Sequence, residues 1–237
     1  MKYIIVLFKF FYTLFFYPYS FHNNRNSKVS MLLYTNVKSY RSDLMITMEH
    51  IIRDYHPTLR LKAKKIDYPL NDEVTQLAKE MIEFLKNSQD PVIAEEYSLR
   101  PGVGIAAPQL NISKQLVAIH IPADNDEEEP ISLIMINPRV TRSSVKQTAL
   151  SEGEGCLSID EVYEGLVPRS KRITVEYYDL DGNKQTEKFR DYPAIVIQHE
   201  IDHLNGVLFY DHINEENPFE ITENLELYDF PVVEEEL

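Results

Sequence analysis

The sequence of 237 residues contains one cysteine, seven glycines and no tryptophan. One cysteine cannot form an internal disulfide, and so few glycines exclude a collagen-like or glycine-rich fibrous repeat. Hydrophobic residues make up 43% and charged residues 26% of the chain, which excludes a wholly disordered protein. The length favours one globular domain with appendages. The single thiol is therefore free, bound to a metal or paired with another molecule.

Acidic residues are absent from residues 1–42, and bases are scarce in the remainder. The first 42 residues hold six bases, which leaves 18 bases against 38 acids, a formal charge of −20, for residues 43–237. Such a surface repels phosphate backbones and anionic lipids. We therefore expect no specific nucleic-acid partner unless bases gather in a local patch, and a small or cationic partner instead.

The N-terminus has the composition of a targeting signal. Residues 3–21 carry ten of the 26 aromatic residues and a single charge, Lys9. The apolar stretch after Lys9 has about a dozen residues, as in a signal-peptide core, whereas a spanning helix needs about 20. The following segment is basic and rich in serine and asparagine. We expect a signal-peptide-like segment at 1–21 and a transit peptide or linker at 22–56.

This order of segments indicates import into a plastid-type, apicoplast-like organelle, with no membrane association after processing. A membrane anchor followed by a disordered spacer is the alternative, because the order of the two segments is the same in both cases.

Apolar periodicity in the remaining chain predicts a helix followed by several strands. Between residues 69 and 86, apolar residues recur every three or four positions, as in an amphipathic helix. Strands are expected at residues 115–122, 132–140, 172–178 and 185–189, with an acidic loop at 124–129. With a second helix after these strands, the order favours an α+β fold with antiparallel or mixed sheets.

The second predicted helix begins near Asp191 and ends at Gly206, with Pro193 close to its first position. Apolar residues cover nearly every face of this helix, so we expect it to be central and buried. Ten acids and no base follow from Asp211 onward. We therefore place the folded domain at residues 57–214 and a solvated acidic tail at 215–237.

The buried helix contains the run His-Glu-Ile-Asp-His from His199 to His203. Two histidines at positions i and i+4 lie on one helical face and can bind one metal ion, and Glu200 beside them can accept a proton from water. Two other interpretations are a pair of buried histidines bonded to backbone carbonyls and a closed structural zinc site. The closed site is disfavoured because the chain offers only one thiol.

The third ligand decides the class of metal site. Position 209 is Phe209, where one class of zinc peptidases has histidine, so that class is excluded. Glu223 is a candidate ligand for another class of peptidase. Cys156 is the stronger candidate, because a thiolate with two imidazoles suits Zn²⁺ or Fe²⁺, and Gly155 lets the backbone approach the metal.

Three segments together are similar to those of peptide deformylases. They are Gly102 to Gln109, Glu154 to Ser158 and His199 to His203, and the similarity extends from about Pro57 to Phe209. The resemblance implies antiparallel or mixed sheets packed around a central metal-binding helix. It also implies hydrolytic removal of the formyl group from N-terminal formylmethionine, with release of formate.

The resemblance assigns roles to individual residues. It implies that Cys156, His199 and His203 hold the metal, that Glu200 accepts the proton, and that Gln109 and the Leu157 N–H stabilise the formyl oxygen. The substrate-binding residues that it implies are Gly102, Val103, Gly104, Gly155, Ile195 and Val196. It further implies a structural pair of Arg169 and Asp202, and it places Asp160 where many relatives have proline.

The resemblance also implies one divalent metal ion per chain. Fe²⁺ is expected as the native ion, with Zn²⁺, Ni²⁺ or Co²⁺ as substitutes. The expected partners are N-formylmethionyl nascent peptides, with transient association at the ribosome exit.

Overall fold

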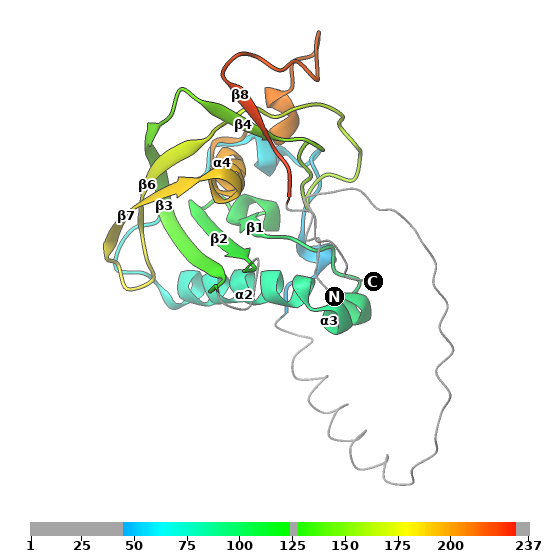
Figure 1. Ribbon diagram of the computed structural model, residues 1–237. Helices are drawn as coiled ribbons and strands as arrows, with labels where there is room; N and C mark the ends of the chain where they lie inside the picture. The colour runs from blue at the N-terminus through cyan, green and yellow to red at the C-terminus, as the bar shows by residue number, and fades with distance from the viewer. Residues whose placement is uncertain (1–44, 124–127, 231–237) are drawn as a thin grey trace, which may run out of the picture.

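The computed structural model describes residues 45–123 and 128–230 (Figure 1). The predicted signal-peptide-like segment, most of the predicted transit peptide and the tip of the acidic loop lie outside these residues. No helix within the described ranges is long and apolar enough to cross a membrane.

Two sheets form the framework of the described chain. The larger has the order β1-β2-β3-β6-β7 with all neighbours antiparallel, and the smaller has the order β5-β4-β8. In the smaller sheet β4 pairs antiparallel with β5 and parallel with β8. The strands are β1 (Gly104–Ala106), β2 (Leu116–Ile121), β3 (Ile131–Ser143), β4 (Gln147–Leu150), β5 (Arg169–Ser170), β6 (Arg172–Tyr178), β7 (Lys184–Arg190) and β8 (Leu225–Tyr228). The sheets are thus antiparallel and mixed, as the sequence predicted.

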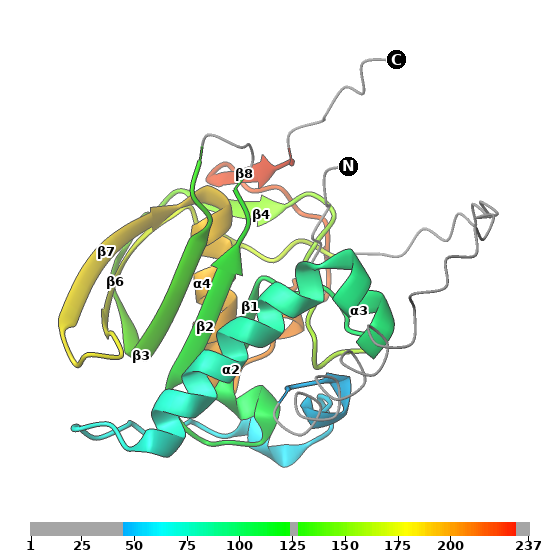
Figure 2. The same cartoon turned by 90° about the horizontal axis from the view of Figure 1, so that it is seen from below.

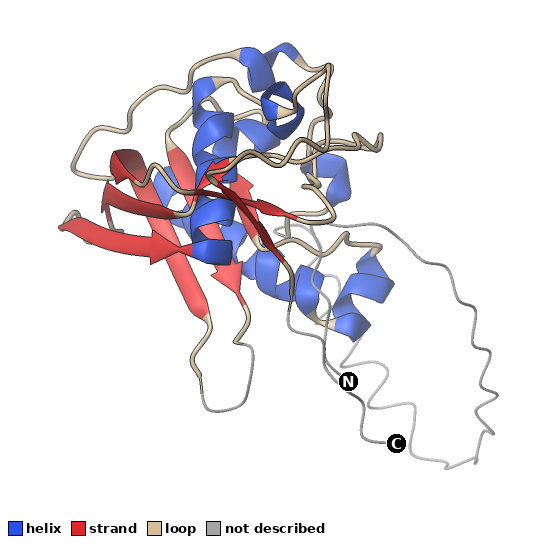
Figure 3. Ribbon diagram, turned by 45° about the horizontal axis from the view of Figure 1, so that its top comes forward, coloured by secondary structure: helices blue, strands red, loops and turns tan. Residues whose placement is uncertain are grey.

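Two helices cover opposite faces of the larger sheet. Helix α2 (Asp72–Gln89) crosses β2 on one face, where Met81, Phe84 and Leu85 pack against Leu116 (Figure 2). Helix α4 (Asp191–Asn205) packs on the other face and lies between the two sheets (Figure 3). The observed order of helix, strands and helix makes the fold α+β, with α4 at its centre.

Local capping signals explain where these helices begin and end. The Asn71 side chain accepts a hydrogen bond of 2.9 Å from the Val74 N–H and so caps α2. The Asp90 carboxylate does the same for the short helix α3 (Pro91–Tyr97). Gly206 ends α4 with a left-handed conformation, φ 75°. A Cβ at Gly206 would lie 2.7 Å from the Arg60 backbone, so only glycine fits there without displacement.

The folded domain starts earlier than the predicted boundary at residue 57. Ile46 and Ile51 are buried in the cluster that contains α2, and the 3-10 turn η1 (Met48–His50) lies between them. The turn η2 (Pro57–Arg60) follows directly. Residues 45–56 are therefore part of the fold, and the predicted linker does not extend to residue 56.

The predicted acidic tail also contributes to the fold. Leu225 is buried, and residues 225–228 form β8 beside β4. The 3-10 turn η4 (Phe209–His212) precedes this segment. The tail is thus not wholly solvated, because one acidic stretch supplies the backbone of an edge strand.

Candidate active site

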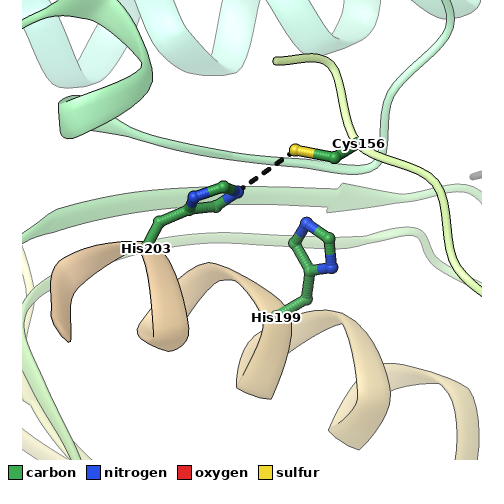
Figure 4. A group of neighbouring side chains, drawn as sticks. All are labelled: Cys156, His199 and His203. Atoms are coloured by element: carbon green, nitrogen blue, oxygen red, sulfur yellow. Dashed lines mark hydrogen bonds between the residues drawn. The ribbon is translucent and has the colours of Figure 1, made fainter. Parts of the chain in front are cut away.

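Three potential metal ligands from distant parts of the chain converge in the interior (Figure 4). Cys156, in the loop after β4, and His199 and His203, on α4, place their ligand atoms within 4.8 Å of one another. The Sγ atom of Cys156 lies 3.3 Å from Nε2 of His203. All three side chains are buried. The predicted convergence of sulfur and imidazoles is therefore present, and this donor set suits Zn²⁺ or Fe²⁺.

A buried carboxylate orients the first histidine. Nδ1 of His199 lies 2.7 Å from Oε2 of Glu154, an arrangement in which Nδ1–H donates and Nε2 remains available to a metal. Arg169 donates to both carboxylate oxygens of Glu154, at 2.8 and 2.9 Å. Arg169 also pairs with Asp202, as predicted. The role of Glu154 was not predicted from the sequence, although its place in the Cys156 motif was a usable signal.

The ionisation of these groups favours a bound cation. Burial opposes the charge on Glu154, yet Arg169 and His199 lower the pKa of its carboxyl to about 2. Burial also opposes a charged His199, but Cys156 and Glu154 outweigh it and raise the pKa of His199 well above its usual range. A divalent cation among the three ligands would replace the proton on Nε2 of His199. The residues therefore fit such an ion.

The second histidine is suited to bind metal as a neutral ring. Burial is the main cause that lowers the pKa of His203 well below its usual range, and the neighbouring His199 adds to this effect. Its Nδ1 atom is buried and has no hydrogen-bond partner among the described residues. A neutral imidazole is the form that coordinates a metal.

Glu200 lies beside the ligands with one oxygen unpaired. Its Oε2 atom is buried and has no hydrogen-bond partner within the described part of the chain. Burial raises the pKa of Glu200 to about 7, which suits a general base near neutral pH. A Cβ at Gly104 would lie 2.5 Å from Oε1 of Glu200. The absence of a side chain at Gly104 thus leaves room for the Glu200 carboxylate.

The Gln109 amide is held with its nitrogen toward the metal ligands. Gln109 lies in the 3-10 turn η3 (Ala107–Leu110), and its Oε1 accepts a 2.8 Å hydrogen bond from the Ala106 N–H. Its Nε2 lies 3.3 Å from Oγ of Ser158 and 3.6 Å from Sγ of Cys156. The Nε2 donor of Gln109 thus lies beside the cysteine ligand, and its role toward the formyl oxygen stays a prediction.

One arginine and its acidic partner fix the loop that carries the cysteine. Arg100 donates to the carbonyls of Cys156 and Ile159, both at 3.1 Å, and to Oδ1 of Asp160 at 2.9 Å. Asp160 also accepts a 2.8 Å hydrogen bond from Nε of Arg53. Asp160 thus anchors this loop through ion pairs with Arg53 and Arg100.

The N-terminal segment 51–54 joins the two loops of the site. The Ile52 N–H donates to the Gln109 carbonyl at 2.8 Å, and the Asp54 N–H donates to the Ser158 carbonyl at 3.0 Å. These backbone contacts follow no side-chain pattern, so the sequence did not reveal them. Residues that were predicted to be a linker therefore support the active site.

Five of the six predicted substrate-binding residues are buried. Leu157 is buried, and a Cβ at Gly102 would lie 3.0 Å from its Cδ1 atom. Val103, Ile195 and Val196 are buried together in the core cluster that contains α4. Gly155 is partly exposed. The methionine pocket that we expected from these residues stays a prediction.

The alternative third ligand is not supported. Glu223 is exposed and does not belong to the group of possible ligands that contains the two α4 histidines. The peptidase interpretation, which required Glu223 beside these histidines, is therefore wrong.

Comparisons with known proteins agree with this geometry. Residues 48–219 match the family model for polypeptide deformylase. A peptide deformylase of Ligilactobacillus salivarius is 57% identical over 180 residues, which cover 76% of this chain and 97% of the relative. That of Enterococcus faecalis is 52% identical over 183 residues, with coverage of 76% and 98%.

Solved structures show the same relationship. A class I type b peptide deformylase from Acinetobacter baumannii matches with a TM-score of 0.55 and 30% identity over 70% of this chain and 99% of its own. The Thermotoga maritima peptide deformylase matches with a TM-score of 0.54 and 32% identity, over 69% and 96% of the two chains. The chain therefore belongs to the peptide deformylase family, metallo-hydrolases that remove the formyl group from N-terminal formylmethionine.

Proposed function

We propose that Cys156, His199 and His203 hold one divalent cation and that Glu200 moves the proton during deformylation. The convergence of one sulfur and two imidazoles beside the unpaired Oε2 of Glu200 carries this proposal. When bound, the cation supplies Lewis-acid chemistry that polarises the formyl group and makes water more acidic. Glu200 accepts the proton that the attacking water loses and later returns it to the leaving amine.

Two donors of this chain stabilise the negative charge that develops on the formyl oxygen. One is Nε2 of Gln109, which is directed toward the centre because Oε1 is occupied by the Ala106 N–H. The other is the backbone N–H of Leu157, next to the cysteine ligand. Losing one such donor typically lowers kcat by about 10²–10³-fold.

Formate release from a formyl-Met tripeptide tests these roles. Glu200→Ala and Gln109→Leu should each retain one metal ion per chain and release formate at least about 100-fold more slowly than the parent protein. Cys156→Ala should lose the metal. Near-normal turnover in the purified Glu200→Ala or Gln109→Leu protein would contradict the assignment.

Elemental analysis of the purified protein identifies the metal. We propose Fe²⁺ as the native ion, with Zn²⁺, Ni²⁺ and Co²⁺ as functional substitutes, because sulfur and imidazole ligands accept all four. The protein must be purified without oxygen, since ferrous iron beside a thiolate is vulnerable to oxidation. Elemental analysis of that protein should find iron, and stoichiometric zinc with no iron would contradict this proposal.

The substrate pocket is proposed from the apolar residues beside the centre. Val103, Ile195 and Val196 would receive the methionine side chain, with Gly102, Gly104 and Gly155 giving the peptide backbone access. An unbranched thioether suits such an apolar environment. Val196→Phe should raise KM for formyl-Met peptides more than it lowers kcat, and an unchanged KM would exclude Val196 from the pocket.

We further propose that the chain is imported into a plastid-type organelle and associates transiently with the ribosome exit there. The aromatic, apolar composition of residues 3–21 and the acid-free segment that follows support import. Deleting residues 1–42 from a fluorescent fusion should abolish organelle import. Unchanged import would refute this targeting role.

A further inference from the structure

The outer face of β3, β6 and β7 concentrates positive charge. Along β6, Ile173 and Val175 point inward and are buried in the core cluster with α4, so the alternate residues point to the opposite face. The residues of that face include six bases and one acid, Glu176. The bases, here called the basic face, are Arg139, Arg142, Arg172, Lys184, Lys188 and Arg190.

Three bases of the basic face have no ionic partner among the described residues. Glu176 pairs with Arg139 at 2.7 Å and with Lys184 at 3.1 Å, and Arg190 pairs with Asp191 at 2.7 Å. The other three make no ion pair within residues 45–123 and 128–230, and all three are exposed. They are Arg142, Arg172 and Lys188.

The arrangement of these charges is not explained by folding. Arg172 stands directly opposite Arg190 in the β6–β7 ladder. Like charges at directly opposed positions destabilise a sheet. Lys188 and Arg142 flank Thr174 from the two neighbouring strands, in the next row of the same face. A surface that gathers cations against the stability of the sheet suits an anionic partner.

A depression of about 410 Å³ lies among these side chains. Its lining consists of four bases of the basic face, three hydroxyl residues (Ser143, Ser144 and Thr174) and the apolar residues Ile173 and Phe189, and it includes no carboxylate. Guanidinium groups bind phosphate oxygens through paired hydrogen bonds, and hydroxyls can donate further ones. The basic and hydroxyl side chains of the lining therefore suit phosphate groups.

The basic face contrasts with the rest of the chain. Residues 43–237 carry a formal charge of −20, and no lysine or arginine follows Arg190. An extended polyanion would be repelled by most of the surface, so it would be held at this face. Because α4 packs on the inner side of the same sheet, the metal ligands of α4 lie on the side of the sheet opposite the basic face (Figure 1).

We propose that the basic face binds the phosphate backbone of RNA without sequence preference. The inference rests on the proposed function, in which the substrates are newly made peptides. Such peptides emerge from the ribosome, whose surface is rich in RNA. Binding through Arg142, Arg172 and Lys188 would hold the enzyme close to emerging N-termini.

Anisotropy of a labelled single-stranded 20-nucleotide RNA, titrated with the metal-loaded full chain, tests the proposal. The triple variant Arg142→Gln, Arg172→Gln, Lys188→Gln should bind at least about tenfold more weakly than the parent protein. The slope of log K against log salt should fall by about 2, since each single-strand phosphate contact contributes about 0.7.

A matched control distinguishes the effect of losing the basic face from the effect of losing three positive charges anywhere on the surface. The control is the triple variant Lys62→Gln, Lys65→Gln, Lys79→Gln. It removes the same number of positive charges from exposed positions outside the basic face and should retain parental RNA affinity. Equal loss in the two triple variants, or no RNA binding by the parent protein, would overturn the proposal. Tighter binding to phosphatidylserine vesicles or polyglutamate than to RNA would also overturn it.

Formate release distinguishes this proposal from the proposed function. Both triple variants should deformylate a free formyl-Met tripeptide at the parental rate, because none of the six residues lies in the active site. Normal formate release without RNA binding would reject the RNA-binding face alone. Absence of formate release from the metal-loaded parent protein would reject the proposed function.

Discussion

The contact between Gly104 and Glu200 gives a sharp test of the catalytic carboxylate. An added Cβ at Gly104 would lie 2.5 Å from Oε1, 2.8 Å from Cγ and 2.9 Å from Cδ of Glu200. Ordinary contacts need about 3.5 Å, so the carboxylate must move by roughly 1 Å in Gly104→Ala. A displacement of this size can lower the rate about 10²-fold. We expect that loss in kcat with unchanged metal content, because the added methyl group meets the base and not the ligands.

Gly102→Ala is the matched control for this prediction. Its Cβ would lie 3.0 Å from Cδ1 at the end of the Leu157 side chain, which can move aside. Neither glycine has a positive φ, so alanine strains the backbone at neither position. The assay compares formate release and metal content for both variants. Equal kcat values for Gly104→Ala and Gly102→Ala would refute the argument that close packing positions Glu200.

Two further predictions concern stability. Glu154→Gln should lower the free energy of unfolding, measured in urea, by about 3–5 kcal/mol, because it leaves the buried charge of Arg169 incompletely paired. The same variant should bind metal about 10–100-fold more weakly. An unfolding free energy within about 1 kcal/mol of the parent value would contradict this. Asp211→Asn tests pH dependence: burial opposes the charge of Asp211, but hydrogen bonds from Arg60 and the Leu208 N–H lower the pKa of its carboxyl. The folded-state pKa is thus below the unfolded value of about 3.9, so the stabilisation is present above pH 4 and is lost as the pH falls through the folded-state pKa. The difference in Tm between parent and Asp211→Asn should be clear at pH 6 and should shrink as the pH is lowered below 4, and a constant difference would exclude an ionic origin.

The sequence predicted those elements whose signals are local. The helix expected from Asp191 to Gly206 is present as Asp191–Asn205. It could be predicted because its apolar residues and its C-terminal glycine lie close together in the sequence. The β6–β7 hairpin is also present where it was expected. The spacing of His199 and His203 fixed two ligands on one helical face before any tertiary contact was known.

Features that depend on distant backbone contacts were not predictable. The segment around Ile52 has no periodicity, and its place beside Gln109 depends on a hydrogen bond between residues far apart in sequence. The acidic composition around Leu225 indicated a solvated tail, although the backbone of that segment pairs with β4. Composition describes which side chains meet water, whereas strand pairing uses the main chain.

The pairing of Glu154 with His199 and Arg169 shows a similar limit. Each residue was visible in the sequence, but only the fold brings the carboxylate between a ligand and a buried guanidinium. The family resemblance predicted the pair of Arg169 with Asp202. It did not predict the pair of Arg169 with Glu154, in which the guanidinium contacts both carboxylate oxygens.

X-ray absorption spectroscopy of the anaerobically prepared, zinc-loaded protein measures which atoms surround the metal. We expect one sulfur scatterer at about 2.3 Å and two imidazole nitrogens at about 2.0–2.1 Å from Zn²⁺. In Cys156→Ala the sulfur contribution should disappear together with tight metal binding. A parent protein whose bound metal is surrounded only by oxygen and nitrogen would contradict the convergence of Cys156 with the two α4 histidines on one ion.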